Sequence, residues 1–263
     1  WPSYDGMVRL TGALPIHVPV RRDNYHPDFD ALEAHVTENT RAIILNTPNN
    51  PTGAVYTPEE TERLVEFAVK HDLWILDDMI YSTLVWTDVG YTSPCAFEGG
   101  SERTLTIGGW SKGWAMTGWR LGWITGPTNV MDGVKIVNVS SATHVPTFLM
   151  PAAAKALSLD EEVQVMKNAF AERRVLMHQG LSSLPGFVVP EPEGAFYILC
   201  DITGTGLTDI EFAHQALEHA QVQVIPGSLM KGGDGLIRIS YATSIANIHE
   251  GVRRLKAWLE SRS

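Results

Sequence analysis

Several features are scarce in this sequence, and each scarcity excludes a class of function. The 263 residues include two cysteines and no His-Glu-x-x-His motif, so neither a disulfide framework nor a metal site is indicated. No apolar run approaches the ~20 residues that a membrane-spanning helix needs. Positive charge is scarce too: 20 basic residues against 30 acidic ones give a net charge of −10, which argues against nucleic acid or an anionic membrane as partner. We therefore expect a small-molecule partner and a cytoplasmic protein.

The pattern that is present is an alternation of strands and helices in the first half of the chain. Short β-type runs at residues 41–46, 73–77, 104–107 and 120–125 are interleaved with helical patterns at 27–36 and 57–71. Thr57-Pro-Glu-Glu60 is a capping box that predicts the start of the second helix. This alternation is typical of βαβ units with a mainly parallel sheet, so the fold class is α/β. Residues 14–20 also read as an edge strand, and residues 1–4 as a turn.

The second half predicts a different organisation. Ser158-Leu-Asp-Glu161 is a second capping box, which predicts a long bridging helix over residues 158–182. Strand patterns near 187–189, 195–200, 222–225 and 236–240, with helices beginning at Thr208 and near Ile245, predict a smaller α+β domain. We therefore divide the chain into a large domain at 1–157, the bridging helix at 158–182 and a small C-terminal domain at 183–263.

Polar side chains directly follow two of the predicted parallel strands. A rigid Asn- and Pro-rich turn containing Asn50 follows the strand at 41–46, and Asp78 follows the strand at 73–77. Open α/β sheets bind ligands at the carboxyl ends of their strands. Tyr81 lies about one helical turn from Asp78, so the pair is spaced to hold one small ring from two sides. An ordinary structural turn is the alternative for Asn50, and an N-cap is an equal alternative for Asp77.

Lys112 lies in a stretch, residues 110–123, that is crowded with tryptophan and also contains Arg120. Burial near a second positive charge lowers the pKa of a lysine and frees its lone pair for attack on a carbonyl. An ordinary solvated lysine is the alternative, and for an isolated lysine it would be the better interpretation.

Four motifs together resemble the signature series of a known family. Asn49-Asn-Pro-Thr-Gly53, Asp78-Met-Ile-Tyr81, Ser111-Lys112 with Arg120 eight residues later, and Leu236-Ile-Arg238-Ile-Ser240 follow the order and spacing of the class I/II aminotransferases. These are fold-type-I enzymes that use pyridoxal 5′-phosphate. The resemblance implies a three-layer αβα large domain with a mainly parallel sheet and a smaller C-terminal α+β domain.

The resemblance also implies roles around the cofactor ring. Lys112 is expected to hold the cofactor as a Schiff base and to carry a proton as general base and acid. Asp78 is expected to face the pyridine nitrogen, where a carboxylate favours the protonated ring and hence its capacity to accept electrons. Tyr81 and Asn50 are expected to hydrogen-bond the phenolic oxygen.

Further roles concern the phosphate and the substrate. Ser111 and Arg120 are expected to bind the phosphate, although Gly109 stands where many family members have a phosphate-binding serine. Arg238, together with Asn50, is expected to bind the substrate α-carboxylate, because a planar fork of donors suits that group. Trp1 is expected to stack on the cofactor ring.

The predicted function is a ping-pong transfer of an amino group from an L-amino acid to a 2-oxo acid. Two alternatives stay open: a carbon–sulfur β-lyase that uses the same residues, and the aminotransferase-like sensing domain of a transcriptional regulator, which the acidic balance does not support. No second arginine is evident for a side-chain carboxylate, so an acidic substrate is not indicated. A homodimer is expected from the resemblance. Because the chain begins at Trp1 without methionine, we also expect an upstream part carrying the family's N-terminal arm and glycine-rich phosphate turn.

Overall fold

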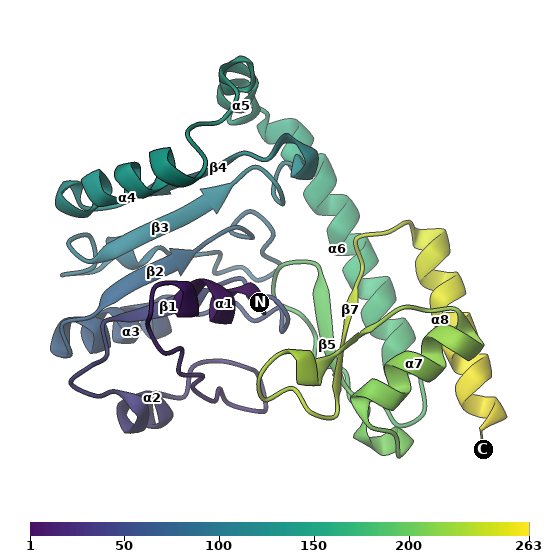
Figure 1. The fold of residues 1–263 in the computed structure, drawn as a ribbon. Helices are drawn as coiled ribbons and strands as arrows, with labels where there is room; N and C mark the ends of the chain where they lie inside the picture. The colour runs from purple at the N-terminus through teal and green to yellow at the C-terminus, as the bar shows by residue number, and fades with distance from the viewer. Residues whose placement is uncertain (263) are drawn as a thin grey trace. The chain divides into compact units, whose positions relative to one another are not determined.

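The structure, a computed structural model, describes residues 1–262, and the chain divides into two compact units. The terminal unit consists of Trp1–His35, Asn50–Ala54 and Asn168–Ser263, and the central unit of Val36–Asn49 and Val55–Lys167. Each unit has its own sheet (Figure 1). One long helix, α6 (Asp160–Ser182), contributes residues to both units.

The central unit contains the predicted, mainly parallel sheet, with strand order β1-β2-β3-β4. Strands β1 (Ala42–Asn46), β2 (Trp74–Asp78) and β3 (Thr104–Gly109) are parallel, and β4 (Gly122–Thr125) is antiparallel to β3. In register, Asn46 pairs with Asp78 and Asp78 with Ile107, so the three parallel strands end at one edge. The sequence-based prediction of an α/β fold with a mainly parallel sheet is confirmed.

Helices α3 (Pro58–Lys70) and α4 (Thr128–Ser141) flank this sheet, and α5 (Met150–Ala156) precedes α6, as Figure 1 shows. The capping box predicted for α3 is confirmed, because the Glu60 N–H donates to Thr57 Oγ1 at 3.2 Å and the Thr57 N–H donates to Glu60 Oε2 at 3.0 Å. The apolar face of α3, which includes Leu64 and Ala68, is buried. Burial of that face, more than helix propensity, holds α3 in place.

The terminal unit contains an antiparallel sheet with strand order β5-β7-β6. The strands are β5 (Tyr197–Asp201), β6 (Ile225–Pro226) and β7 (Leu236–Ser240), and the helices are α1 (Ser3–Leu10), α2 (Phe29–His35), α7 (Asp209–Ala220) and α8 (Ile245–Ser261). Phe212 of α7 is fully buried and its ring lies 5.1 Å from that of Trp258 of α8. The β7 strand has the bounds that its Leu-Ile-Arg-Ile-Ser pattern predicts.

Three local predictions are wrong. Residues 14–20 form no strand and contribute only the bridge Val20 to Pro27, while residues 187–189 contribute only the bridge Val188 to Asp201. The turn predicted at residues 1–4 is present, because the Tyr4 N–H donates to the Trp1 carbonyl oxygen at 3.2 Å, and it leads into α1. Helix α6 begins at Asp160, one residue later than a cap at Ser158 requires, and the Ser158 hydroxyl donates to the Lys155 carbonyl oxygen at 2.8 Å.

Candidate active site

Asp78 and Tyr81 lie at the carboxyl edge of the central unit's sheet. Asp78 is the last residue of β2, and its carbonyl oxygen accepts a hydrogen bond of 3.0 Å from Asn46 Nδ2 at the end of β1. Its side-chain Oδ1 accepts from the Ile80 N–H at 3.2 Å, which fixes the start of the turn that follows. Tyr81 is buried, with 3% of its surface exposed. The strand end and the turn thus bring a carboxylate and a phenol to one edge.

Ser111 and Lys112 lie in the loop that leaves β3 at the same edge. This loop closes on itself, since the Met116 N–H donates to the Trp110 carbonyl oxygen at 3.2 Å and the Ala115 N–H to the Lys112 carbonyl oxygen at 3.2 Å. Ser111 and Lys112 are both half-buried. A predicted reactive lysine therefore lies three residues after the end of β3, one of the two inner strands of the sheet.

The lysine loop packs on the turn that carries Tyr81. A Cβ added at Gly113 would lie 2.3 Å from Thr83 Oγ1, and one added at Gly109 would lie 3.2 Å from Ile80 Cδ1. Only glycine allows so close an approach of the two segments. Of the predicted site residues, the structure thus brings Asp78, Tyr81, Ser111 and Lys112 into one neighbourhood of the central unit.

Arg120 joins this edge through the β3–β4 pairing. The Trp110 N–H donates to the Leu121 carbonyl oxygen at 3.3 Å, so the backbone of Arg120 lies beside the start of the lysine loop. Arg120 has a left-handed backbone with φ 54°, its side chain is exposed, and its Nη1 donates to the Thr117 carbonyl oxygen at 2.9 Å. Its remaining guanidinium donors can bind an anion.

Two buried polar atoms beside Lys112 suggest a polar ligand. Within residues 1–262, Trp110 Nε1 and Thr83 Oγ1 are buried and have no hydrogen-bond partner. Leaving such groups unpaired costs about 1–3 kcal/mol each, and a bound ligand or water is one way to satisfy them. An amine, a carboxylate, a phenol and a hydroxyl at this edge are the donors and acceptors that pyridoxal 5′-phosphate needs, so these residues fit that cofactor.

In the terminal unit, the structure brings Arg238, Asn50 and Trp1 together through hydrogen bonds. Arg238 Nη1 donates to Asn50 Oδ1 at 2.8 Å, and the backbone nitrogen of Trp1 donates to the Asn50 carbonyl oxygen at 3.2 Å. Asn50 is 6% exposed, whereas Trp1 is 50% exposed with its ring edge-on to Tyr4. The Arg238–Asn50 bond joins residues 188 positions apart in the chain.

Among residues 1–262, no carboxylate forms an ion pair with Arg238. It is half-buried in β7, and residues 1–262 contribute no acidic group within ion-pair distance of it. Its second interaction is with an aromatic ring: Arg238 Cζ lies 4.6 Å from the centroid of the Tyr197 ring. A partly buried guanidinium without a protein carboxylate is suited to bind an external one.

Asp77 is a buried acid whose environment the sequence did not predict. It lies inside β2 with no exposed surface and caps no helix, so the N-cap alternative is wrong. The Tyr91 hydroxyl donates to its Oδ2 at 2.5 Å, while Oδ1 has no partner within residues 1–262. Burial, foremost, together with the nearby Asp78 carboxylate, raises the pKa of Asp77 to about 6. Burial and the Asp77 carboxylate also raise the pKa of Tyr91. Side chains alternate along a strand, so Asp77 and Asp78 point to opposite faces of the sheet. This alternation is the sequence signal that could have predicted the burial of Asp77.

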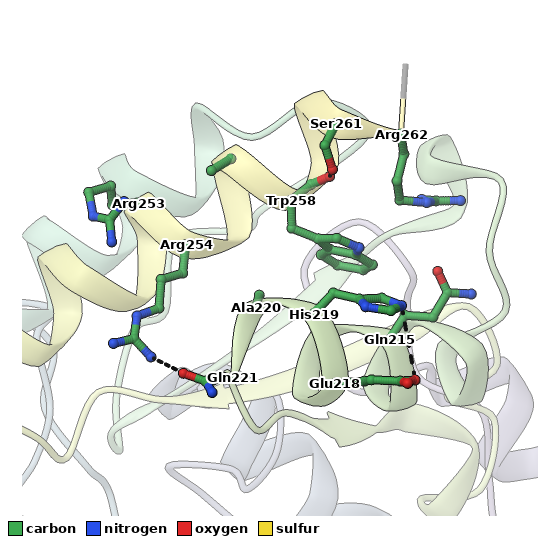
Figure 2. Close-up of a pocket in the computed structure, with 11 residues that line it drawn as sticks. Gln215, Glu218, His219, Ala220, Gln221, Arg253, Arg254, Trp258, Ser261 and Arg262 are labelled. Carbon is green, nitrogen blue, oxygen red and sulfur yellow. Dashed lines mark hydrogen bonds and ion pairs between the residues drawn. The ribbon is translucent and has the colours of Figure 1, made fainter.

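The surface groove between α7 and α8 holds none of the predicted site residues (Figure 2). Its arginines are already engaged: Arg253 and Arg254 both pair with Glu250 at 2.8 Å, and Arg254 also donates to Gln221. Arg262 lies over the ring of Trp258, 5.6 Å from its centroid. We therefore assign no function to this groove.

Across residues 1–262, no cluster of three or more His, Cys, Asp or Glu side chains is placed to bind a metal. None of the helices in this range is long and apolar enough to cross a membrane.

Known proteins resemble this chain over nearly its full length. The family described as aminotransferase class I and II matches residues 1–255. Aromatic-amino-acid aminotransferase 2 of Thermococcus litoralis is 40% identical over 99% of the chain and 68% of the relative, and an aspartate aminotransferase of Pyrococcus abyssi is 38% identical over the same shares.

Solved structures agree with the sequence relatives. An aromatic aminotransferase from Pyrococcus horikoshii OT3 superposes with a TM-score of 0.96 at 37% identity, covering 100% of this chain and 71% of that one. An aspartate aminotransferase from Thermus thermophilus with maleate gives a TM-score of 0.92 at 35% identity, covering 98% of this chain and 67% of that one. The chain therefore belongs to the class I and II aminotransferases, the fold-type-I enzymes whose cofactor is pyridoxal 5′-phosphate.

Proposed function

We propose that the chain transfers an amino group from an L-amino acid to a 2-oxo acid, with Lys112 as its catalytic residue. The observation that carries this proposal is the meeting of the Lys112 loop with the Asp78–Tyr81 turn at the carboxyl edge of the parallel sheet. When bound, pyridoxal 5′-phosphate supplies an aldehyde that condenses with amines and a ring that takes up the electron pair released at the substrate Cα. The protein supplies orientation and proton transfer.

In the central unit, each side chain has a role that its chemistry supports. The Lys112 amine holds the cofactor and then accepts and returns the proton of the substrate Cα. The Asp78 carboxylate holds a proton on the pyridine nitrogen, and the Tyr81 phenol donates to the ring oxygen. Ser111 and Arg120 bind the phosphate, Arg120 as the cation. Gly109 contributes no hydroxyl, which increases the share of phosphate binding that Arg120 provides.

In the terminal unit, Arg238 binds the α-carboxylate of the substrate. Asn50 orients Arg238 through its side-chain oxygen and also serves the cofactor, and Trp1 offers a flat ring for stacking. Every amino acid and 2-oxo acid carries an α-carboxylate, so Arg238 serves both half-reactions. The names of the relatives divide between aromatic amino acids and aspartate. Phenylalanine, tyrosine and aspartate are therefore the first amino acids to assay.

Replacing Lys112 tests the proposal directly. Wild-type protein incubated with the cofactor and then with borohydride should retain a covalent adduct, and Lys112→Ala should lose it together with transferase activity. Lys135→Ala, which removes an exposed lysine of α4, is the matched control and should keep both. An adduct retained in Lys112→Ala would show that another lysine holds the cofactor. Ammonia released from an amino acid without any 2-oxo acid would instead indicate lyase chemistry.

Oligomeric state, compartment and domain division complete the proposal. A homodimer is supported by α4, which has no buried residue and leaves Ile136 and Val137 about two-thirds exposed, at 68% and 66%. Sedimentation should give a dimer that Val137→Glu weakens; a wild-type monomer at all concentrations would contradict it.

A cytoplasmic location is supported by the two cysteines, which form no disulfide. The division at 1–157, 158–182 and 183–263 is supported by a mainly parallel sheet in the first part and an antiparallel one in the last, whereas Trp1–His35 groups with the last part.

A further inference from the structure

The surroundings of Arg238 are unusual for a charged residue in a sheet. Arg238 lies on β7, the middle strand, and the residues opposite it are Leu199 on β5 and Ile225 on β6, both apolar. Within residues 1–262 its side chain has two partners: Asn50 Oδ1, at 2.8 Å from Nη1, and the ring of Tyr197, whose centroid is 4.6 Å from Cζ. Neither partner carries a negative charge. Within residues 1–262, one N–H donor of the guanidinium has a protein acceptor and the other four have none.

Strand register explains how Tyr197 reaches Arg238. Tyr197 pairs with Ser240, two residues along β7 from Arg238, so the two side chains are diagonal neighbours on one face of the sheet. Diagonal neighbours lie within reach of aromatic and long side chains. Tyr197 is 8% exposed, and the attraction between a cation and a ring face is stronger where water is excluded.

A ring face holds a guanidinium in a way that a carboxylate does not. A carboxylate would neutralise the charge and occupy two of the in-plane donors. A ring face attracts the cation from above its plane and uses none of the N–H groups. Within residues 1–262 the arginine is thus held at two points, at Nη1 by Asn50 and near Cζ by the Tyr197 ring, while the remaining donors stay available for a ligand.

We propose that Tyr197 is a positioning residue for substrate binding: its ring holds the Arg238 guanidinium so that the donors not used by Asn50 receive the substrate α-carboxylate. This inference rests on the proposed function, since it takes the carboxylate as the ligand of Arg238. It assigns to Tyr197 a contribution to carboxylate recognition in both half-reactions and no part in proton transfer.

The test compares a carboxylate ligand with its neutral amide. Titration calorimetry of the holoenzyme with 3-phenylpropionate and with 3-phenylpropanamide isolates the carboxylate, because the two ligands have nearly the same shape. Tyr197→Leu removes the ring and should weaken binding of the carboxylate by roughly 3- to 30-fold, while the amide changes by less than about 2-fold. Tyr197→Phe keeps the ring and should bind both ligands within about 2-fold of wild type.

Two further variants separate the possible failures. Phe187→Leu, which removes a half-buried ring packed on Phe212, is the matched control and should leave both ligands unchanged. If Arg238→Gln leaves the preference for carboxylate over amide intact, then the assignment of Arg238, and with it the proposed function, is wrong. If Arg238→Gln abolishes the preference but Tyr197→Leu does not alter it, only the role of Tyr197 is overturned. Equal weakening of carboxylate and amide by Tyr197→Leu would also overturn it.

A second readout needs no ligand. An aromatic ring facing a guanidinium displaces the proton resonance of the arginine Nε–H by its ring current. The Arg238 resonance should therefore move toward the free-arginine position in Tyr197→Leu and stay displaced in Tyr197→Phe. An Arg238 resonance that is the same in wild type and in Tyr197→Leu would show that the ring does not hold the guanidinium.

Discussion

Asp77 should make the stability of the protein depend on pH in a direction opposite to that of most carboxyl groups. Its pKa is about 6 in the folded protein against an ordinary value of 3.8 in an unfolded chain, because burial disfavours the charged form. The folded state therefore holds this proton more tightly. The contribution of Asp77 to the free energy of unfolding is fully present below pH 3.8, falls as the pH rises, and levels off above about pH 6.

The size of the effect follows from the two pKa values. Their difference is about 2, and each pH unit corresponds to ~1.4 kcal/mol, so the total loss is about 3 kcal/mol. About 2 kcal/mol of this falls between pH 4.5 and pH 7.5. Carboxyl groups with lowered pKa values, such as Glu250 and Glu211, contribute the opposite slope below their ordinary pKa values. Comparison of wild type with Asp77→Asn cancels their contribution.

Urea unfolding of wild type and Asp77→Asn at pH 4.5 and pH 7.5 measures the effect. Asparagine keeps an oxygen that can accept the Tyr91 hydroxyl, and its own cost of burial does not change with pH. The free energy of unfolding of the variant relative to wild type should therefore rise by about 2 kcal/mol between the two pH values. Asp88→Asn, at an exposed position, should show no such change. A relative stability of Asp77→Asn that stays constant within ~0.5 kcal/mol would refute the reasoning.

Three other substitutions test the packing and the turns. Thr57→Ala removes the cap that pairs with Glu60 and should lower the free energy of unfolding by about 1 kcal/mol in urea titrations. Gly53→Ala should lower it by at least about 1–2 kcal/mol, because Gly53 has φ +76° and an added Cβ would lie 2.7 Å from Pro192 Cβ; an unchanged melting temperature would contradict this. Phe212→Ala should cost about 3–5 kcal/mol, because its ring is fully buried against two other rings.

Local sequence rules correctly predicted the helix starts that depend only on neighbouring residues. The capping boxes at Thr57 and Thr208 start α3 and α7 as predicted, because each threonine and the glutamate three residues later satisfy one another's backbone N–H groups. The same pattern at Ser158 does not cap α6, which begins at Asp160, and the Ser158 hydroxyl instead bonds to the carbonyl oxygen of Lys155 in the last turn of the preceding helix. Residues 14–20 have a strand-like composition but find no partner strand, and a strand exists only through its pairing.

The sequence motifs predicted which residues form the candidate site but not which side chains contact one another there. Asp78 ends β2 and Lys112 follows β3, and strand ends of a parallel sheet share an edge, so their approach could be inferred from the order of strands and motifs along the chain. The contact of Arg238 with Tyr197 depends on a register between two distant strands, and composition does not encode that register. The burial of Asp77 depends on Tyr91, which a loop carries back to β2.

The place of Arg238 between two isoleucines on a strand paired on both sides has a consequence for how recognition can fail. Side chains alternate along a strand, so a slip of β7 by one position would put Ile237 or Ile239 where the cation belongs. Carboxylate binding would then vanish altogether instead of declining by degrees. Insertions or deletions next to Leu236 should therefore leave substrate binding unchanged when only the glycine-rich turn at 232–235 changes its conformation. They should abolish substrate binding when β7 shifts its register.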